Sequence, residues 1–314
     1  MLRTSAWLAL VALAVLWWLL VFGVLGFDPS TPGSDAWNYL AAGERLNAGH
    51  PLYALSPGDR PITLVPPYWT VPLLAPPPIA VVWRPLALLG DPAMTLWAGA
   101  GLLATLATAG WLLVRGGLAT AAIVAVLAAP IAIQSLAGNA NAFLFGILVL
   151  AWVFRARPAV VGSLVAAAIA IKLTPVLLLL WLATARRWHG VGATALALAV
   201  IGVVSLAGAG LQNHLDWLAS VPQSVPAPTS LAGITGISST VLLAIAAIVV
   251  LGVSRRGDER LTFSVAVVAA ALVSPALYLG TFGIAAASAA AWIPERGSVL
   301  ASLRAAQRPR PTTA

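Results

Sequence analysis

The sequence predicts an all-α protein that crosses a membrane repeatedly, with about nine or ten membrane segments and a large first outer loop. Only 8% of its 314 residues are charged and 61% are hydrophobic, whereas roughly a quarter of an ordinary soluble domain is charged. Apolar runs rich in Ala, Leu and Val recur along the chain, and several reach the roughly 20 residues that a helix needs to cross a bilayer. These runs do not alternate apolar and polar residues as barrel strands do, so we expect helices.

The net charge of +8 does not indicate nucleic-acid binding, because the arginines stand singly or in pairs between apolar runs and form no basic patch. That distribution is typical of topology signals in membrane proteins. Cysteine is absent, which excludes a disulfide framework and a cysteine metal site. We therefore expect membrane lipids, and no nucleic acid, among the partners of this chain.

The apolar runs predict membrane segments over 6–26, 92–114, 118–136, 140–154, 159–171, 173–183, 190–210, 237–253, 261–274 and 276–293. With the N-terminus in the cytoplasm, 13 of the 17 basic residues lie on the cytoplasmic side and six of the nine acids lie outside. The reverse orientation would violate the positive-inside tendency. The sequence thus predicts a multi-pass plasma-membrane protein with both termini in the cytoplasm, built as one domain over 1–295 with a basic tail over 296–314.

Two outer loops follow from this topology, over 27–91 and 211–236. The first loop includes 68–90, which looks like a span but contains several prolines and Arg84. Because counting it as a span would move Arg115 to the outer side, we expect it to lie on the outer surface or to re-enter the membrane.

The stretch 159–183 is expected to form two half-length helices broken at Thr174-Pro175. Proline removes a helix donor and disfavours helix at the preceding residue. The break leaves Lys172 near an outward-facing cavity, and a lysine within a membrane segment is a candidate functional residue. Alternatively, Lys172 extends its ammonium group to the membrane interface.

The least apolar stretch is GFDPSTPGSDAWNYLAAGERLNAGHPLY, residues 26–53, which places Asp28, Asp35 and Glu44 among aromatic residues. It directly follows the first apolar run. We interpret it as the active-site loop of a membrane enzyme, with Asp35 as the base. A carboxylate can accept the proton of an attacking hydroxyl, and partial burial raises its pKa towards a useful value.

Taken in order, the motifs of this chain resemble those of glycosyltransferase family 87, the actinobacterial polyprenol-phosphate-mannose-dependent α-mannosyltransferases of the GT-C superfamily. The motifs are Asp35 with AGHPLY (48–53), the segment PYWTVPLLAPPPIAVVWRPLALL, a span start with Gln134, Asn139 and Asn141, and AIAIKLTPVLLLLWLATARRW (168–188). A late motif keeps Ser274 and Pro275, while Gly280 and Thr281 stand where the family has a His-Tyr pair.

The resemblance implies a GT-C-like fold and an inverting transfer of mannose on the outer face of the membrane. The donor would be polyprenyl-phosphomannose, and the acceptor a lipid-linked glycan of the phosphatidylinositol mannoside or lipomannan type. Such a reaction needs a base and groups that stabilise the departing phosphate. We expect no cofactor and no metal, because the three histidines are far apart in sequence and the acids form no DxD motif. The catalytic candidate is Asp35, and the candidate substrate-binding residues are Lys172, Arg84, Arg45, Trp37, Tyr39, Tyr68, Gln134, Asn139, His214 and Ser274.

Each polar candidate also has a structural interpretation. Asp35 could cap the amphipathic helix expected over 36–47. Glu44 and Arg45 could form a solvated helix face, and Arg84 could anchor its segment at the headgroups. The remaining candidates include possible loop histidines and interfacial aromatics, namely His50, His214, Trp37, Tyr39 and Tyr68.

Three other functions stay open from the sequence. A polyprenyl-phosphoarabinose donor would use the same residue types. A transporter of lipids or sugars could also contain broken helices and a buried lysine, although transporters usually have paired repeats and midplane charges. A catalytically degenerate relative would explain the missing His-Tyr pair.

Overall fold

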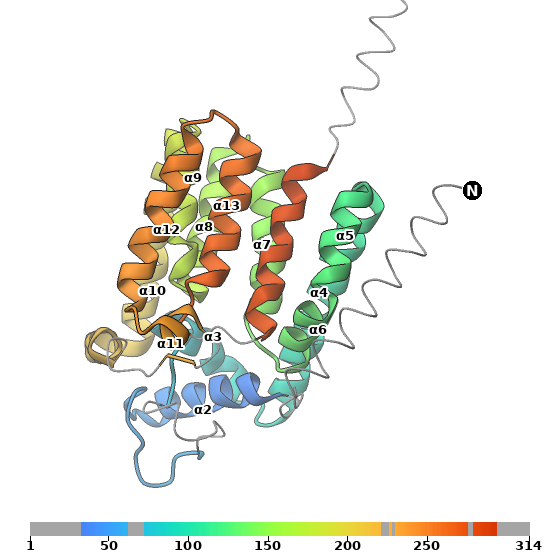
Figure 1. The fold of residues 1–314 in the computed structure, drawn as a ribbon. Helices are drawn as coiled ribbons and strands as arrows, with labels where there is room; N and C mark the ends of the chain where they lie inside the picture. Colours follow the sequence, from blue (N-terminus) through green and yellow to red (C-terminus); the bar gives the residue numbers. More distant parts are fainter. Residues whose placement is uncertain (1–32, 62–71, 221–225, 228–229, 276–278, 294–314) are drawn as a thin grey trace, which may run out of the picture.

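The computed structural model of the protein describes residues 33–61, 72–220, 226–227, 230–275 and 279–293. These residues form helices and connecting loops, without a strand in any of the described ranges. Most helices stand side by side as a bundle, and α2 (Ser34–Ala48) lies across one end of it (Figure 1). The all-α prediction is confirmed, whereas the expected first segment, 6–26, and Tyr68 lie outside the described residues.

The bundle is built from apolar helices that bury large aromatics and small residues together. Trp181 and Phe263 are fully buried, and their ring centroids lie 4.8 Å apart. Small residues allow close backbone approach, which is how membrane helices pack. The helices of the bundle are α4 (Pro92–Arg115), α5 (Leu118–Val126), α6 (Ala128–Leu136), α7 (Asn141–Val153), α8 (Pro158–Ile171), α9 (Leu177–Thr184), α10 (Trp188–Ser220), α12 (Ser239–Ser254), α13 (Glu259–Leu272) and the alanine-rich 3₁₀ helix η3 (Leu279–Trp292).

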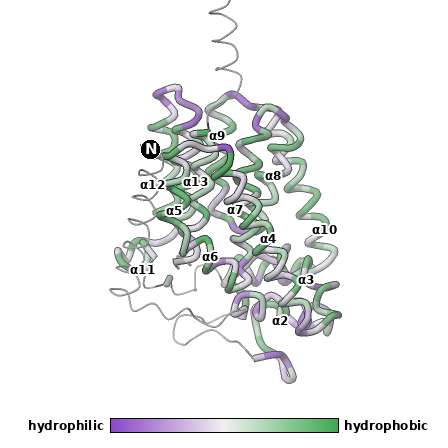
Figure 2. Tube along the Cα trace, turned by 90° about the vertical axis from the view of Figure 1, so that its right-hand side faces the viewer, coloured by the Kyte–Doolittle hydropathy of each residue, from purple (hydrophilic) through white to green (hydrophobic). Residues whose placement is uncertain are grey.

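Two helices of the described chain, α4 and α10, are each long and apolar enough to cross a membrane. The pair α5 and α6 would make a third span, although it is bent by 51°. The helices α7, α8 and α12 and the stretch Thr174–Thr184 are apolar but shorter. Hydrophilic residues collect at the two ends of the bundle and apolar residues between them (Figure 2). These features are those of a helical membrane protein.

The two breaks within the apolar runs have local causes. The stretch 159–183 is broken as expected: α8 ends at Ile171, and Lys172 has an extended backbone (φ −152°, ψ 133°) before a 3₁₀ turn over Thr174–Val176. The stretch predicted as a membrane segment over 118–136 forms two helices, α5 and α6, because the chain bends by 51° at Leu127. Pro130 lies in the first turn of α6, where its missing N–H is tolerated. An unbroken helix from α5 through Pro130 would lack that hydrogen bond and meet the proline ring, so the chain bends before it.

The elements at the α2 end pack on one another rather than projecting as loose loops. Within the expected surface segment 68–90, residues Pro77–Ala87 form the helix α3, which packs against α2 and α10. Gly43 makes the α2–α3 approach close, because a Cβ there would lie 2.6 Å from the Trp83 carbonyl oxygen. Gly210 (φ 76°) interrupts α10, so the apolar part of α10 ends where the second outer loop was predicted to begin.

Candidate active site

A cavity of about 290 Å³ lies between the α2 end and the bundle, and Asp35 and Lys172 both line it. We call it the Asp35 cavity. Its walls come from segments far apart in the sequence, which the fold brings together. The described residues that line it are Asp35, Asn38, Tyr39, 72–76, 139–141, 171–174, Trp217, Ser239, Thr240, Leu243, 273–275 and Thr281.

Asp35 is held at the start of α2 by the loop between α6 and α7. Gly33 takes a left-handed conformation (φ 84°) and is the N-cap residue of α2. The Gly33 N–H donates to the carbonyl oxygen of Leu136 (2.9 Å), and the Asp35 N–H donates to that of Ala137 (3.0 Å). The interpretation of Asp35 as a helix cap was therefore wrong: its carboxylate makes no capping bond and points instead to Asn139.

Asn139 fixes the orientation of the Asp35 carboxylate. Its Nδ2 donates to Asp35 Oδ2 at 2.8 Å, while its Oδ1 accepts from the Asn141 N–H at 2.7 Å. Because the Asn141 bond identifies which end of the amide is oxygen, the donor end must face Asp35. Asp35 Oδ1 makes no hydrogen bond within the described chain and stays available to a ligand.

The electrostatic setting of Asp35 combines two opposing effects. Burial raises the pKa of the Asp35 carboxyl above its ordinary value, and this effect outweighs the Asn139 hydrogen bond and the charge of Lys172, both of which lower it. Lys172 is near enough to interact electrostatically, yet the two groups form no ion pair among the described residues. A carboxyl group and an amine thus line one cavity without forming an ion pair.

Tyr39 ties the cavity wall to an aromatic cluster behind it. Tyr39 is 8% exposed and lies one helical turn from Asp35 on α2. Its ring centroid lies 6.0 Å from that of Trp83 and 6.2 Å from that of Trp97. Trp97 Nε1 in turn donates to the Gly138 carbonyl oxygen at 2.9 Å, next to Asn139. The cluster therefore stabilises both partners of the Asp35–Asn139 hydrogen bond.

Five of the sequence candidates meet in the Asp35 cavity, namely Asp35, Tyr39, Asn139, Lys172 and Ser274. Ser274 is 1% exposed and its Oγ has no hydrogen-bond partner within the described ranges. Polar or aromatic lining residues that sequence reasoning missed are Asn38, Asn141, Thr174, Trp217, Ser239, Thr240 and Thr281. Asn38 and Asn141 stood next to chosen candidates, whereas nothing in the sequence separates Trp217 from the rest of the second outer loop, or Ser239 and Thr240 from the rest of the predicted segment 237–253.

The arginine candidates lie outside the lining. Arg84 donates to the carbonyl oxygen of Gly208 (2.8 Å) and to Asn47 Oδ1 (3.1 Å), so it joins α3 to α10 and α2. Arg45 is 2% exposed, and burial lowers its pKa although nearby Asp59 opposes the shift. The interpretation of Arg45 as part of a solvated helix face was therefore wrong.

Other candidates are also held by neighbours away from the cavity. Gln134 is buried beside Gly283 in the α6–η3 contact. His214 Nε2 lies 2.9 Å from Ser205 Oγ, and its Nδ1 lies 2.8 Å from the Gly210 carbonyl oxygen, so both ring nitrogens are engaged within α10. His50 lies in the loop after α2, with Nδ1 2.7 Å from Asp59 Oδ1.

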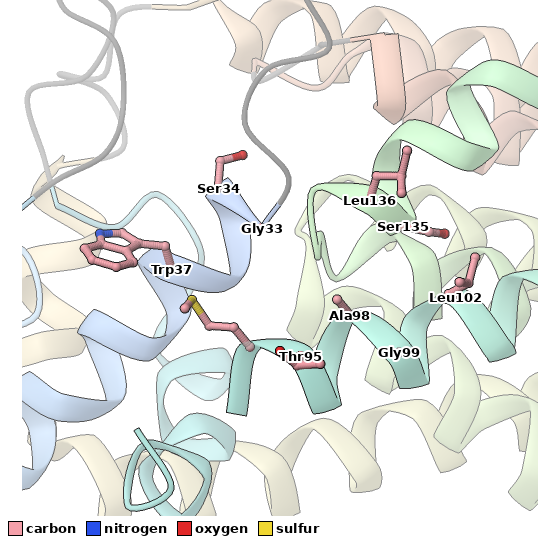
Figure 3. A pocket seen from close by; sticks show the side chains of 10 residues that line it. Gly33, Ser34, Trp37, Thr95, Ala98, Gly99, Leu102, Ser135 and Leu136 are labelled. Atoms are coloured by element: carbon pink, nitrogen blue, oxygen red, sulfur yellow. The ribbon is translucent and has the colours of Figure 1, made fainter. Parts of the chain in front are cut away.

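A second cavity of about 510 Å³ lies on the other side of the start of α2, and Trp37 lines it. Figure 3 shows that its side chains come from α2, α4 and α6, among them Thr95, Ala98 and Leu102 of α4. The lining that the structure describes carries no ionisable side chain. The larger cavity therefore offers no acid–base chemistry, and the candidate active site is the Asp35 cavity.

Comparison with known proteins identifies the chain by family. The family model described as glycosyltransferase family 87 matches residues 74–306, about three quarters of the chain. No curated protein and no solved structure gives a significant match. In the described ranges, no three His, Cys, Asp or Glu side chains lie close enough together to hold a metal ion.

Proposed function

The chain belongs to glycosyltransferase family 87, and we propose that it transfers a mannosyl residue from polyprenyl-phosphomannose to a lipid-linked glycan of the phosphatidylinositol mannoside or lipomannan type. The observation that carries this proposal is the Asp35 carboxylate facing Lys172 across one cavity without an ion pair. Transfer from a sugar phosphate needs the carboxylate and the ammonium group to be apart, because the carboxylate acts on the acceptor hydroxyl and the ammonium group acts on the leaving phosphate.

The reaction is a single displacement with inversion. Asp35 Oδ1 accepts the proton of the acceptor hydroxyl as the hydroxyl oxygen bonds to the anomeric carbon. The bond from that carbon to the phosphate oxygen breaks, and its electron pair leaves with the phosphate. Lys172 stabilises the charge that develops there. The raised pKa of Asp35 suits a base, since proton transfer is most efficient when its pKa approaches the working pH.

Asp35 and Lys172 have complementary supports for these roles. Asn139 occupies Oδ2 and leaves Oδ1 free, so the base presents one defined oxygen to the acceptor. Lys172 lies in the extended break between α8 and the helix that follows, so its backbone belongs to neither helix and its side chain is not fixed to a helix face. Trp217 and the amides Asn38 and Asn141 provide an aromatic face and polar groups suited to a sugar.

The charges at the two ends of the bundle support the proposed orientation in the membrane. The end opposite the Asp35 cavity carries eight of the described arginines, among them Arg115, Arg155 and Arg186. Under the positive-inside tendency that end faces the cytoplasm. The cavity then opens on the outer face of the plasma membrane.

The departure at Gly280 and Thr281 does not remove the groups on which this mechanism depends. Gly280 packs against Gln134, with a Cβ position only 3.3 Å from the Gln134 backbone nitrogen, so a larger side chain would have to displace α6. Thr281 lines the cavity. The proposed transfer relies instead on Asp35 and Lys172, which line the same cavity.

The test is a transfer assay in membranes that contain the full chain or Asp35→Asn at equal abundance. Radiolabelled polyprenyl-phosphomannose is supplied with extracted phosphatidylinositol mannosides. We expect label in the glycolipid product with the wild type and at least about 100-fold less with Asp35→Asn. Glu44→Gln is the control, since Glu44 is on the same helix but is bonded to Arg60 outside the cavity. If label is transferred only from polyprenyl-phosphoarabinose, mannose is not the transferred sugar. If Asp35→Asn transfers label as well as the wild type, Asp35 is not the base.

A further inference from the structure

The N-terminus of α12 meets the Asp35 cavity, which Lys172 also lines. Ser239 and Thr240, the first two residues of this 16-residue helix, both line the cavity. Ser238 is the N-cap residue, and its Oγ accepts from the Val241 N–H. That cap leaves the N–H groups of Ser239 and Thr240 without an intrahelical partner, as at every helix start. Such groups and the helix dipole favour an anion at this position.

An independent feature of the same cavity also calls for a ligand. Ser274 is 1% exposed, lines the cavity, and its Oγ has no hydrogen-bond partner in the part of the chain that the structure describes. A buried hydroxyl without a partner costs free energy until something bonds to it. The carboxyl ends of α8 and α13 also reach the cavity, at Lys172 and Val273, but the α8 end carries the lysine ammonium. The cavity therefore combines the free N–H groups of α12, the Lys172 ammonium and the Ser274 hydroxyl as donors.

We propose that the α12 N-terminus, Lys172 and Ser274 together bind the phosphate of a lipid phosphate, with the Ser239 and Thr240 backbone N–H groups as direct donors. This inference rests on the proposed function, because it assigns the place of the donor's leaving group. Thr240 is exposed, whereas Thr174 is buried, so the phosphate lies towards the cavity mouth, with the buried Ser274 hydroxyl on its inward side, and the sugar lies further in near Asp35.

The mouth favours a lipid phosphate over free phosphate. Leu173 lines the cavity and is 47% exposed, and Leu243 lies one turn beyond Ser239 on the same face of α12. An alkyl chain leaving the phosphate would cover these apolar side chains as it passes into the membrane. Inorganic phosphate could use the donors but would leave both leucines uncovered.

The structure allows one backbone donor to be removed without breaking the helix. Proline is favoured at the first position of a helix, where its missing N–H has no intrahelical role. The residue before proline must be extended, and Ser238 already is (φ −60°, ψ 144°). Ser239→Pro thus deletes the N–H, while Ser239→Ala deletes only the hydroxyl. Leu118→Pro is the matched control, because Leu118 opens α5 away from the cavity after the extended residue Gly117.

The experiment measures binding of radiolabelled farnesyl phosphate to the full chain in phosphatidylcholine nanodiscs, with farnesol and inorganic phosphate as competitors. We expect farnesyl phosphate to bind at least tenfold more tightly than farnesol. Ser239→Pro should weaken the binding of farnesyl phosphate about tenfold and leave the binding of farnesol unchanged. Ser239→Ala should have a smaller effect than Ser239→Pro, and Leu118→Pro should have none. Lys172→Met should weaken the binding of farnesyl phosphate more than Ser239→Pro does.

Three results would overturn the inference. They are unchanged binding of farnesyl phosphate by Ser239→Pro, equal affinity for farnesol, and competition by inorganic phosphate at the same concentration as farnesyl phosphate. If Ser239→Pro does not fold, Ser239→Asp replaces it, since an acid stabilises a helix start but repels a phosphate. Ser239-dependent binding without mannosyl transfer would reject the proposed donor or acceptor and keep this site. Transfer with Ser239-independent binding would reject the site alone.

Discussion

The two ends of the bundle use opposite charges in different ways. At the end away from the cavity, Arg187 meets Glu259 in a bidentate pair, with Nε–Oε1 and Nη2–Oε2 distances of 2.6 and 3.0 Å. Its Nη1 also donates to the Arg155 carbonyl oxygen at 2.8 Å. At the cavity end, Asp35 and Lys172 face each other without an ion pair. Directly paired charges hold helices together, whereas charges kept apart in one cavity remain available to a substrate.

The contrast extends to what surrounds each charge. The Arg187 and Glu259 side chains keep 25% and 30% of their exposure, so water still solvates the pair. Asp35 is enclosed enough that burial dominates its pKa. Enclosure of an unpaired charge destabilises a protein, and such a cost is typical of functional sites.

The largest expected effect comes from removing the unpaired cation. Lys172→Met should lower mannosyl transfer by about 100-fold or more, because one preorganised charge on a leaving group is worth that much. Its thermal midpoint should stay equal to or above that of the wild type, since a desolvated charge without a partner is replaced by an apolar chain. Transfer rate and thermal midpoint are measured on the same preparation. A large fall in the thermal midpoint would show instead that Lys172 stabilises the fold, as the paired Arg187 and Glu259 do.

The next effect separates two glycines with the same backbone conformation. Gly138 has φ +66° and a Cβ there would lie 2.7 Å from Ala36 Cβ, whereas Gly257 has φ +71° and open space around it. Gly138→Ala should displace the start of α2 from Asn139 and lower transfer about tenfold or more, since small misplacements of reacting groups are costly. Gly257→Ala should cost stability only. Equal transfer rates for the two variants would show that the α2–Asn139 contact does not position the base.

The smallest effect on activity is expected for the paired charges. Arg187→Met should leave transfer per folded molecule unchanged and lower the thermal midpoint by about 2–4 °C, because Glu259 loses its partner. Arg187→Lys should recover part of that loss, since lysine keeps the charge but not the two-pronged geometry. The midpoint is read from thermal unfolding in detergent. A selective loss of transfer in Arg187→Met would break the division between the two ends.

The sequence was sufficient for the fold class and for part of the lining of the candidate site. Hydrophobic run lengths predicted the helices, and Pro175 predicted the break beside Lys172. These signals are local or depend on a charge count. Asp35 and Asn139 were both chosen, but their hydrogen bond joins residues 104 positions apart.

What the sequence did not predict depends on long-range packing. Arg45 looked solvated because it adjoins Glu44 on a polar helix, yet it is 2% exposed and has Tyr53 and Asp59 near it. The fold also brings the start of α12 and Trp217 to the same cavity as Asp35. Neither carries a local motif, and each is placed by the helices packed around it.

The central claim is that the Asp35 carboxylate, set by Asn139, accepts the proton of the acceptor. The most direct test is the pH dependence of single-turnover transfer by the wild type, by Asn139→Ala and by the control Asn47→Ala. Asn47 is a suitable control because its side chain bonds Arg84 outside the cavity. The base must be ionised, so transfer should rise with pH through the raised pKa of Asp35, above the ordinary value near 4 for aspartate. Asn139→Ala removes a donor that favours the charged form, which raises the pKa further and moves this rise to higher pH, while Asn47→Ala leaves it in place. A rate independent of pH, or a rise that Asn139→Ala does not move, would contradict the account.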